Sequence, residues 1–107
     1  MDELTLTEIV TLAALADSAR YGYEMVDRIS EITDDRIRVR PGNLYRVIDR
    51  LIEQKLVIEV AAPSNVDARR RYFRATAAGQ RAAANHLAMY SQVMKRVTVL
   101  RDVLANG

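Results

Sequence analysis

Three stretches of the chain repeat their apolar residues at the spacing of an α-helix. Residues 4–17 are apolar on more than one face, and Thr5 with Glu8 has the Ser/Thr-x-x-Glu spacing of a capping box. Residues 23–33 have one apolar stripe, and from Pro41 onward apolar residues recur at intervals of three and four. Proline suits the first position of a helix, because the N–H that it lacks would have no partner there. The pattern predicts three short helices, of which the first is buried on two sides, by the domain core and by a partner.

Alternating and β-branched segments predict extended structure around these helices. Residues 36–40 alternate apolar and charged side chains, which predicts a short strand or an extended segment. Residues 56–63 and 68–76 are two extended runs around a short polar loop, so they predict a β-hairpin. If Phe73 faces the core, its neighbour Tyr72 faces outward together with the arginines of this run, and the hairpin presents a basic surface.

The last predicted helix is much longer than the others. Thr76 can cap it, and no proline interrupts the chain from Ala77 to about Ala105. One seam of this helix alternates steps of four and three over nearly three repeats, as in a coiled coil. The seam consists of His86, Tyr90, Val93, Val97, Leu100 and Leu104. Such a helix would expose its seam in a monomer, so we expect it to pack against a second copy of the chain.

The net charge of +2 hides an uneven distribution along the chain. Residues 1–35 contain two arginines and nine acids, for a net charge of −7. Residues 36–74 contain nine arginines, one lysine and four acids, for +6, and residues 75–107 contain four bases and one acid, for +3. A basic middle suggests a polyanionic partner, although a solvated charged face is the alternative interpretation.

Composition excludes several other kinds of site. The absence of cysteine excludes disulfides and thiolate metal sites and fits a reducing cytoplasm. His86 is the only histidine and has no acidic neighbour at ligand spacing, so we expect no metal and no other cofactor. No signal-peptide pattern opens the chain, and no apolar run approaches the roughly 18 residues of a membrane span. We therefore expect a cytoplasmic protein without a membrane partner.

The helix that begins at Pro41 has the character of a DNA-recognition helix. In a winged helix-turn-helix, the third helix can enter the major groove while a basic wing contacts the backbone or the minor groove. The side opposite the apolar stripe carries Asn43, Arg46 and Arg50, and arginine pairs with guanine as asparagine does with adenine. The helix start offers free N–H groups to a phosphate, and Gly42 lets the backbone come close. The predicted contacts are Gly42, Asn43, Arg46, Arg50, Arg69, Arg70 and Arg71.

The order of these elements predicts a mainly α fold with a small β-hairpin wing, the winged helix-turn-helix, followed by a long C-terminal helix. Residues 1–76 would form the DNA-binding domain and residues 77–107 a dimerisation helix, together one compact unit. A chain of 107 residues has a limited core, and many such chains gain stability by oligomerising.

Four blocks of sequence carry a resemblance to a known family. They are YGYEM at 21–25, RPGNLYRVIDRLIEQKLV at 40–57, RRRYFRAT followed by AAG at 69–79, and the long terminal helix. Over nearly its whole length the chain resembles the short subclass of the PadR-type bacterial transcriptional regulators. The Pro-Gly-x-Leu-Tyr block, followed by Arg50 and Leu51 and by the arginine-rich wing strand, is fairly specific in combination.

The resemblance implies a homodimeric repressor that binds a pseudo-palindromic operator in double-stranded DNA. Tyr45 and Arg50 match the recognition-helix Tyr and Arg of the family, which adds Tyr45 to the predicted DNA contacts, and residues 69–71 match its basic wing strand. In short members the terminal and first helices form the dimer, and some members bind flat hydrophobic drugs between the subunits. A small hydrophobic effector is therefore a further expected partner. The residues expected at the dimer or effector interface are Leu6, Ile9, Val10, His86, Met89, Tyr90, Val93, Val97, Leu100 and Leu104.

Some positions depart from the family pattern. Arg40 stands where the family often has a capping Ser, and Asn43 stands where Thr is usual. The lost cap costs about 0.5–2 kcal/mol, and a cation near the positive end of the helix dipole is mildly unfavourable. A bound phosphate would offset both effects, so Arg40 joins the predicted DNA contacts. The drug-binding members have a Trp on the last helix, where this chain has Tyr90, which leaves the class of ligand open.

Other functions fit this pattern less well. A winged-helix module that binds protein would present apolar anchors on the recognition helix, where this chain has Asn and Arg. An enzyme would need a nucleophile with its base or a pair of carboxylates, and no such arrangement occurs in the sequence. Structural roles also remain open for the predicted contacts. Arg46 and Arg50 could pair with neighbouring acids, Tyr45 could be a half-buried core aromatic, and the wing arginines could protect an edge strand.

Overall fold

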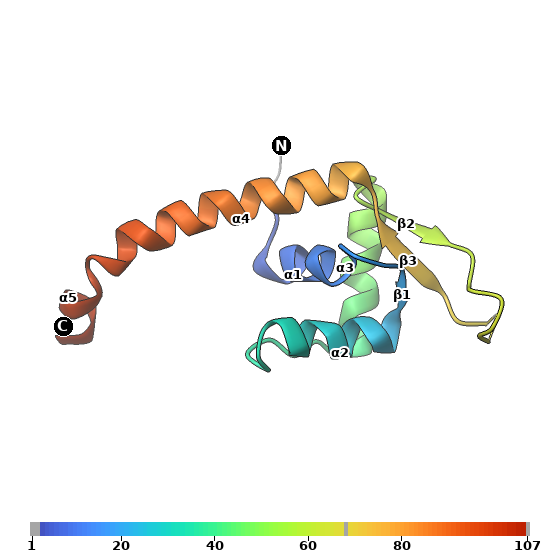
Figure 1. Cartoon of the computed structure of the whole chain (residues 1–107). Helices are drawn as coiled ribbons and strands as arrows, with labels where there is room; N and C mark the ends of the chain where they lie inside the picture. Colours follow the sequence, from blue (N-terminus) through green and yellow to red (C-terminus); the bar gives the residue numbers. More distant parts are fainter. Residues whose placement is uncertain (1–2, 68, 107) are drawn as a thin grey trace.

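The computed structural model describes residues 3–67 and 69–106, and residues 1–2, 68 and 107 of the predicted ranges lie outside them. Helices α1 (Leu6–Ala14), α2 (Gly22–Ile32) and α3 (Pro41–Glu53) pack together beside a small sheet, and helix α4 (Ala77–Thr98) runs across them and away to one side (Figure 1). The three predicted short helices are confirmed. The principal extents of 55 × 28 × 21 Å reflect the projecting part of α4.

The sheet has three short antiparallel strands in the order β1-β3-β2. Strands β2 (Val57–Val60) and β3 (Tyr72–Ala75) form the predicted hairpin, with Val57 opposite Ala75. Both strands are shorter than the predicted runs of residues 56–63 and 68–76, so residues 69–71 precede β3 and do not lie in a wing strand. Strand β1 (Arg20–Tyr21) pairs with β3 on its other side, and the sequence did not predict it. Two residues are too few for an alternating pattern, so only the pairing with β3 defines this strand.

Residues 36–40 belong to the connection between α2 and α3 and have no strand pairing, which corrects the short strand included in the predicted order of elements. The alternation nevertheless has a structural result, since Val39 is buried in the core and Ile37 packs against it. The intervening arginines, Arg36 and Arg38, are exposed. The alternating pattern therefore correctly predicted which side chains face the core and which face solvent. The strand that pairs with the outer edge of β3 is β1, and residues 36–40 do not pair with it.

The prediction for Tyr72 is wrong. Tyr72 was expected to face outward and is only 5% exposed. Tyr21 lies opposite it in the β1–β3 register, and the two rings pack with their centroids 5.5 Å apart. Phe73 on the other face of β3 is fully buried and meets the edge of Tyr45 at 6.3 Å between centroids. Tyr72 is therefore covered by its cross-strand neighbour on β1, although Arg74 on the same face of β3 is exposed.

The apolar stripe of the third helix anchors it to the core, as predicted. Leu44, Val47, Ile48 and Leu51 are buried, and Pro41 is at the start of the helix. The predicted capping box of α1 is also confirmed. The Glu8 N–H donates to Thr5 Oγ1 at 3.1 Å, and the Thr5 N–H donates to Glu8 Oε1 at 2.8 Å. Local signals thus define where these two helices begin.

The start of α4 is held tightly against the turn between α3 and β2. Thr76 caps the helix by accepting from the Gly79 N–H at 3.0 Å, and its hydroxyl donates to the Lys55 carbonyl at 2.8 Å. A Cβ on Gly79 would lie 2.1 Å from the Leu56 carbonyl oxygen. Only glycine permits this approach, because the opposing atom belongs to the backbone and cannot swing aside.

The predicted single helix from Ala77 to about Ala105 is interrupted. Helix α4 ends at Thr98, residues 99–100 form a turn, and the short helix α5 (Arg101–Asn106) follows. Three successive β-branched residues, 97–99, lie at this break, and such residues have low helix propensity. We call the packed part of the molecule, residues 3–67 and 69–90, the compact end, and residues 91–106 the arm; every residue of the arm is exposed.

Candidate nucleic-acid interface

Three polar residues of α3 lie along one side of the helix. Asn43, Arg46 and Arg50 are exposed and follow one another at intervals of three and four. The buried stripe on the other side of α3 fixes the direction in which this surface faces. Because its buried stripe fixes the helix on the core, the three side chains project from a backbone with a defined position, as recognition of a DNA groove requires.

The beginning of α3 is open to an incoming anion. Arg40 occupies the N-cap with extended backbone, and its side chain makes no capping hydrogen bond among the described residues, as its departure from Ser implied. A Cβ built on Gly42 would meet no described atom within 4 Å, so packing does not demand glycine there. Unsatisfied N–H groups at a helix start attract phosphate. Arg40 and Gly42 therefore lie where the sequence placed a phosphate contact.

Tyr45 is half-buried on another side of α3. Its ring meets Phe73 edge to face, and its hydroxyl faces Gly22 at the start of α2, where an added Cβ would lie 2.5 Å from the oxygen. Tyr45 and Arg50 are five residues apart, which separates them by about 140° around the helix. The packing role weighed for Tyr45 is therefore present, and its ring joins α2, α3 and the wing.

Arg50 lies beside an acid that the sequence did not single out as its partner. Its Nε lies 3.7 Å from Oε2 of Glu8, on α1. The Arg50 side chain is 53% exposed, whereas that of Glu8 is only 6% exposed. The pair thus joins an exposed cation of α3 to a buried carboxylate 42 positions earlier in the chain.

Two of the three predicted wing arginines are paired with carboxylates. Arg69 Nη2 lies 3.0 Å from Asp67 Oδ2, and Arg71 Nη2 lies 2.9 Å from Glu59 Oε1 across the hairpin. These hydrogen bonds lower the pKa of the Asp67 carboxyl and the pKa of the Glu59 carboxyl. Each acid offsets part of the positive charge of its arginine.

Arg71 also packs over aromatic rings at the base of the wing. Its guanidinium carbon lies 5.2 Å from the centroid of Phe73 and 6.0 Å from that of Tyr45. Together with the Glu59 pair, these cation–π contacts direct Arg71 toward the junction of wing and α3. Arg71 therefore stabilises the position of the wing.

Arg70 differs from its two neighbours. It lies over the Tyr21 ring, 4.4 Å from the centroid, and this leaves its charge less neutralised than an acid would. Arg74 on β3 is exposed, and the loop before α3 contributes the exposed Arg36 and Arg38. Arg36, Arg38 and Arg74 were absent from the predicted contacts, although the alternating pattern at 36–40 and along the hairpin predicted that they face solvent.

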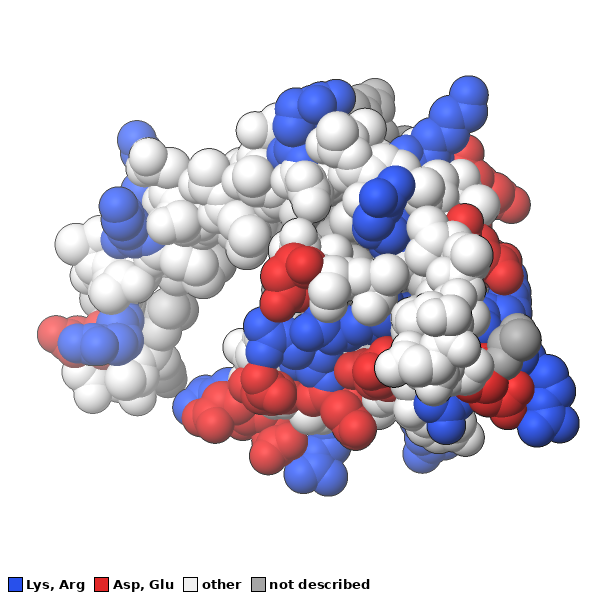
Figure 2. Space-filling model, turned by 45° about the vertical axis from the view of Figure 1, so that its right-hand side comes forward, with Lys and Arg blue, Asp and Glu red and all other residues white. Residues whose placement is uncertain are grey.

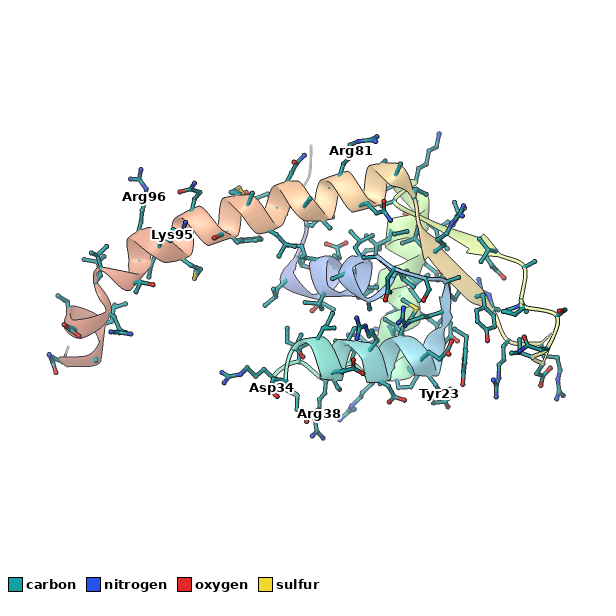
Figure 3. The ribbon with its side chains drawn as sticks, viewed as in Figure 1. Tyr23, Asp34, Arg38, Arg81, Lys95 and Arg96 are labelled. Carbon is teal, nitrogen blue, oxygen red and sulfur yellow. The ribbon has the colours of Figure 1, made fainter. Side chains whose placement is uncertain are left out.

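The surface charge is mixed. Figure 2 shows cationic and acidic side chains interspersed, with acids gathered along the lower part of the molecule, where α2 lies. Arg38 and Tyr23 both extend from this lower side (Figure 3), and Tyr23 is 68% exposed. The acidic N-terminal third and the basic middle of the sequence therefore remain close neighbours in the fold.

The residues predicted for a dimer or effector interface fall into two groups. Ile9 is buried in the chain's own core, which corrects its assignment to an interface, while Leu6 is exposed and Val10 partly so. His86 and Tyr90 contact the N-terminal segment: His86 Nε2 accepts from the Leu4 N–H, and the Tyr90 hydroxyl donates to the Leu4 carbonyl, both at 3.2 Å. The other exposed apolar residues of the predicted set, besides Leu6, are Met89, Val93, Val97, Leu100 and Leu104.

A surface depression of about 510 Å³ lies beside the first half of α4. It includes His86 from the predicted interface set, whereas Met89 and Tyr90 are not part of its lining. Its lining residues are Leu4, Gln54, Leu56, Ala78, Arg81, Ala82, Asn85 and His86. In the part of the chain that the structure describes, no cluster of three or more His, Asp or Glu side chains could hold a metal ion, and no helix could cross a membrane.

Residues 11–85 match the model of the family described as "Transcriptional regulator PadR-like family". An uncharacterized protein X of Lysinibacillus sphaericus is 29% identical over 96 residues, which are 89% of this chain and 81% of that protein.

Solved structures share the fold, and with it the predicted winged helix-turn-helix is confirmed. A PadR-like transcriptional regulator from Bacillus cereus superposes with a TM-score of 0.75 at 21% identity, covering 89% of this chain and 90% of the other. A PadR family transcriptional regulator from Eggerthella lenta gives 0.71 at 24% identity, covering 88% and 80%. Because the family match spans well over half of the sequence, the chain belongs to the transcriptional regulator PadR-like family and is a DNA-binding regulator.

Proposed function

We propose that the protein is a repressor that binds a pseudo-palindromic operator as a homodimer in the cytoplasm, without enzymatic activity. The observation that carries the DNA-binding part of the proposal is the rigid display of Asn43, Arg46 and Arg50 along one side of α3. In this proposal α3 enters the major groove. Asn43 and Arg46, in the first half of the helix, read base edges, and Arg40 with Gly42 binds a phosphate.

The wing would add contacts to the sugar-phosphate backbone. Arg70 is the foremost candidate, because its partner in the free protein is an aromatic ring, whereas Arg69 and Arg71 are paired with acids. An arginine that already has a carboxylate partner must exchange it for a phosphate, so it gains less on binding. The exposed Arg36, Arg38 and Arg74 enlarge the basic surface around α3.

The homodimer is proposed from the uncovered side of α4. In the first half of the helix this side packs on the core through Gly79 and Ala83. At the same helical spacing it continues as Val93 and Val97, which are exposed in the arm. A second copy that covers this continuation would complete an isologous interface, and its two-fold axis would present two copies of α3 to successive major grooves.

Release by a small hydrophobic effector at this interface is part of the proposal. Met89, Tyr90 and Val93 lie near the point where α4 leaves the core, and methionine adapts to ligands of different shape. A flat apolar compound bound between the subunits would change the angle between the two copies of α3. An operator with fixed half-site spacing would then fit less well.

The test begins with selection of a duplex from a randomised DNA pool by the wild-type protein. Arg46→Ala is expected to weaken binding to the selected duplex by about 10- to 100-fold, as for the loss of one arginine–base contact. Arg81→Ala is the matched control, since Arg81 is exposed on α4 and extends from the upper side of that helix (Figure 3), away from α3. Failure to enrich any sequence, or equal binding by wild type and Arg46→Ala at fixed salt, would overturn the proposed recognition surface.

The repressor assignment needs a separate measurement. A reporter gene placed behind the selected duplex should be expressed less when the wild-type protein is present, and Arg46→Ala should restore its expression. Increased expression with the wild-type protein would identify an activator instead. Sedimentation of the free protein at micromolar concentration measures the homodimer independently of DNA.

A further inference from the structure

Glu8 is an unusual residue in this fold because its carboxylate is almost fully buried. Its side chain is 6% exposed, on the first turn of α1. One carboxylate oxygen, Oε1, accepts the Thr5 N–H at 2.8 Å and so completes the capping box. The capping role does not use the other oxygen, Oε2, which faces Arg50 of α3. A buried carboxylate needs a compensating charge, and Arg50 supplies it.

The geometry of the contact leaves the end of Arg50 available. The approach is through Nε, the inner nitrogen of the guanidinium, at 3.7 Å from Oε2. That separation is too long for a hydrogen bond, so the interaction is an ion pair. The Arg50 side chain is 53% exposed, and its terminal nitrogens are the atoms that form a bidentate contact with guanine or phosphate.

The backbone that precedes Glu8 is held in place at two residues, Leu4 and Thr5. Leu4 donates its N–H to His86 Nε2 and accepts from the Tyr90 hydroxyl, so α4 fixes the segment that precedes α1. The following residue, Thr5, forms the capping box with Glu8. The Glu8 carboxylate therefore has a defined position with respect to α3.

We infer that Glu8 is a positioning residue for DNA recognition, which holds Arg50 so that its terminal nitrogens project from the recognition side of α3. This inference rests on the proposed function. An arginine that is oriented before binding loses less side-chain freedom when it meets its base or phosphate. The buried negative charge also lowers the general attraction of this region for phosphates. Glu8 thus raises the preference for the operator over other DNA.

Glu8→Gln is the sharpest test. Glutamine can still accept the Thr5 N–H and keep the capping box, while it removes the charge that holds Arg50. We expect binding to the selected duplex to weaken by about tenfold, and binding to an unrelated duplex of equal length to stay unchanged or strengthen by up to about twofold. Unchanged binding to the selected duplex, or an equal loss on both duplexes, would contradict a positioning role.

A double-mutant cycle separates positioning from a general structural effect. If Glu8 acts through Arg50, then Glu8→Gln changes operator affinity by less than about twofold once Arg50 is already Ala. Independent, additive losses would mean that Glu8 serves the fold alone. If Arg50→Ala itself leaves operator binding intact, Arg50 merely neutralises Glu8 and the inference is wrong.

Arg50→Lys provides a second route that does not disturb the buried residue. Lysine keeps the positive charge on an exposed position but has no Nε for Glu8 to hold. We expect about a tenfold loss on the selected duplex and less than a twofold change on the unrelated one. If Arg50→Lys prefers the selected duplex over the unrelated duplex as strongly as the wild-type protein does, the inference is wrong. Failure of the proposed function is a distinct result, because the wild-type protein would then enrich no duplex at all.

Discussion

The compact end and the arm have similar apolar side chains but differ in what covers them. At the compact end, Leu44, Ile48 and Phe73 are fully buried by their own chain. In the arm, Val97, Leu100 and Leu104 belong to the same regular spacing and remain between 40% and 66% exposed. A helical pattern therefore marks a surface that needs a partner, and it does not say whether that partner lies in the same chain.

The largest effect is expected at the joint between the two regions. Gly79→Ala would place a Cβ 2.1 Å from the Leu56 carbonyl, so α4 must move off the compact end. We expect a loss of about 3 kcal/mol or more in the free energy of unfolding, measured by urea titration. Gly42→Ala is the matched control: no described atom lies within 4 Å of its added Cβ, so the unfolding free energy should stay equal or rise slightly. Equal stability of the two variants would show that this joint tolerates displacement.

The next largest effect should appear in the arm. Val93→Asp with Val97→Asp puts two carboxylates on the exposed apolar side, and burial of these charges in an interface is unfavourable. We expect the dimer dissociation constant to rise by about 100-fold or more, measured by analytical ultracentrifugation. Lys95→Asp is the control, since residue 95 lies roughly opposite residue 97 around the helix. If the wild-type protein sediments as a monomer, the predicted dimer is wrong, and the exposed apolar side of the arm must bind a different partner.

A smaller effect is expected inside the compact end, where α2 meets α3. Gly22→Ala would bring a Cβ to 2.5 Å from the Tyr45 hydroxyl oxygen, at the end of a side chain that can shift. We expect a loss of about 1–2 kcal/mol in unfolding free energy. Adding Tyr45→Phe removes the oxygen, so the double variant should recover part of this loss. Additive losses would mean that the hydroxyl is not the obstacle.

The smallest effect concerns the ion pair that joins β2 to β3. The hydrogen bond from Arg71 holds the pKa of Glu59 below its ordinary value of 4.5. The folded state therefore gains stability that is complete above the unfolded pKa and is lost as the pH falls through the lower folded pKa. Both groups are largely exposed, so solvent screening keeps this contribution below about 1 kcal/mol. Glu59→Gln should flatten the fall in unfolding free energy between about pH 5 and pH 3, measured by urea titration.

Much of the fold could be predicted because its determinants are local. The helix starts at Thr5 and Thr76 depend on hydrogen bonds within one turn, the start of α3 depends on a proline in the first position, and the stripe of α3 depends on periodicity alone. The hairpin followed from two extended runs around a polar loop. Strand β1 and the burial of Tyr72 could not be predicted, since each exists only where residues 20–21 meet residues 72–73.

The candidate site divides in the same way. The sequence predicted which polar residues α3 displays, because the buried stripe determines the opposite side of the same helix. The partners of those residues depend on distant elements: Glu8 of α1 faces Arg50, and Glu59 of β2 pairs with Arg71. From the sequence alone, acids close to Arg50 along the chain were the expected partners. The packing of α1 against α3 places Glu8 beside Arg50 in the folded chain.

By itself, the sequence determined the three short helices, the hairpin, the polar side of α3 and the apolar spacing that continues into the arm. These properties arise from hydrogen bonds and periodicities that span only a few residues. The tertiary structure alone decided that Gly79 has no room for a side chain and that Glu8 lies beside Arg50. Each of these depends on which elements come together, and the free energy of such contacts is set by atoms far apart along the chain.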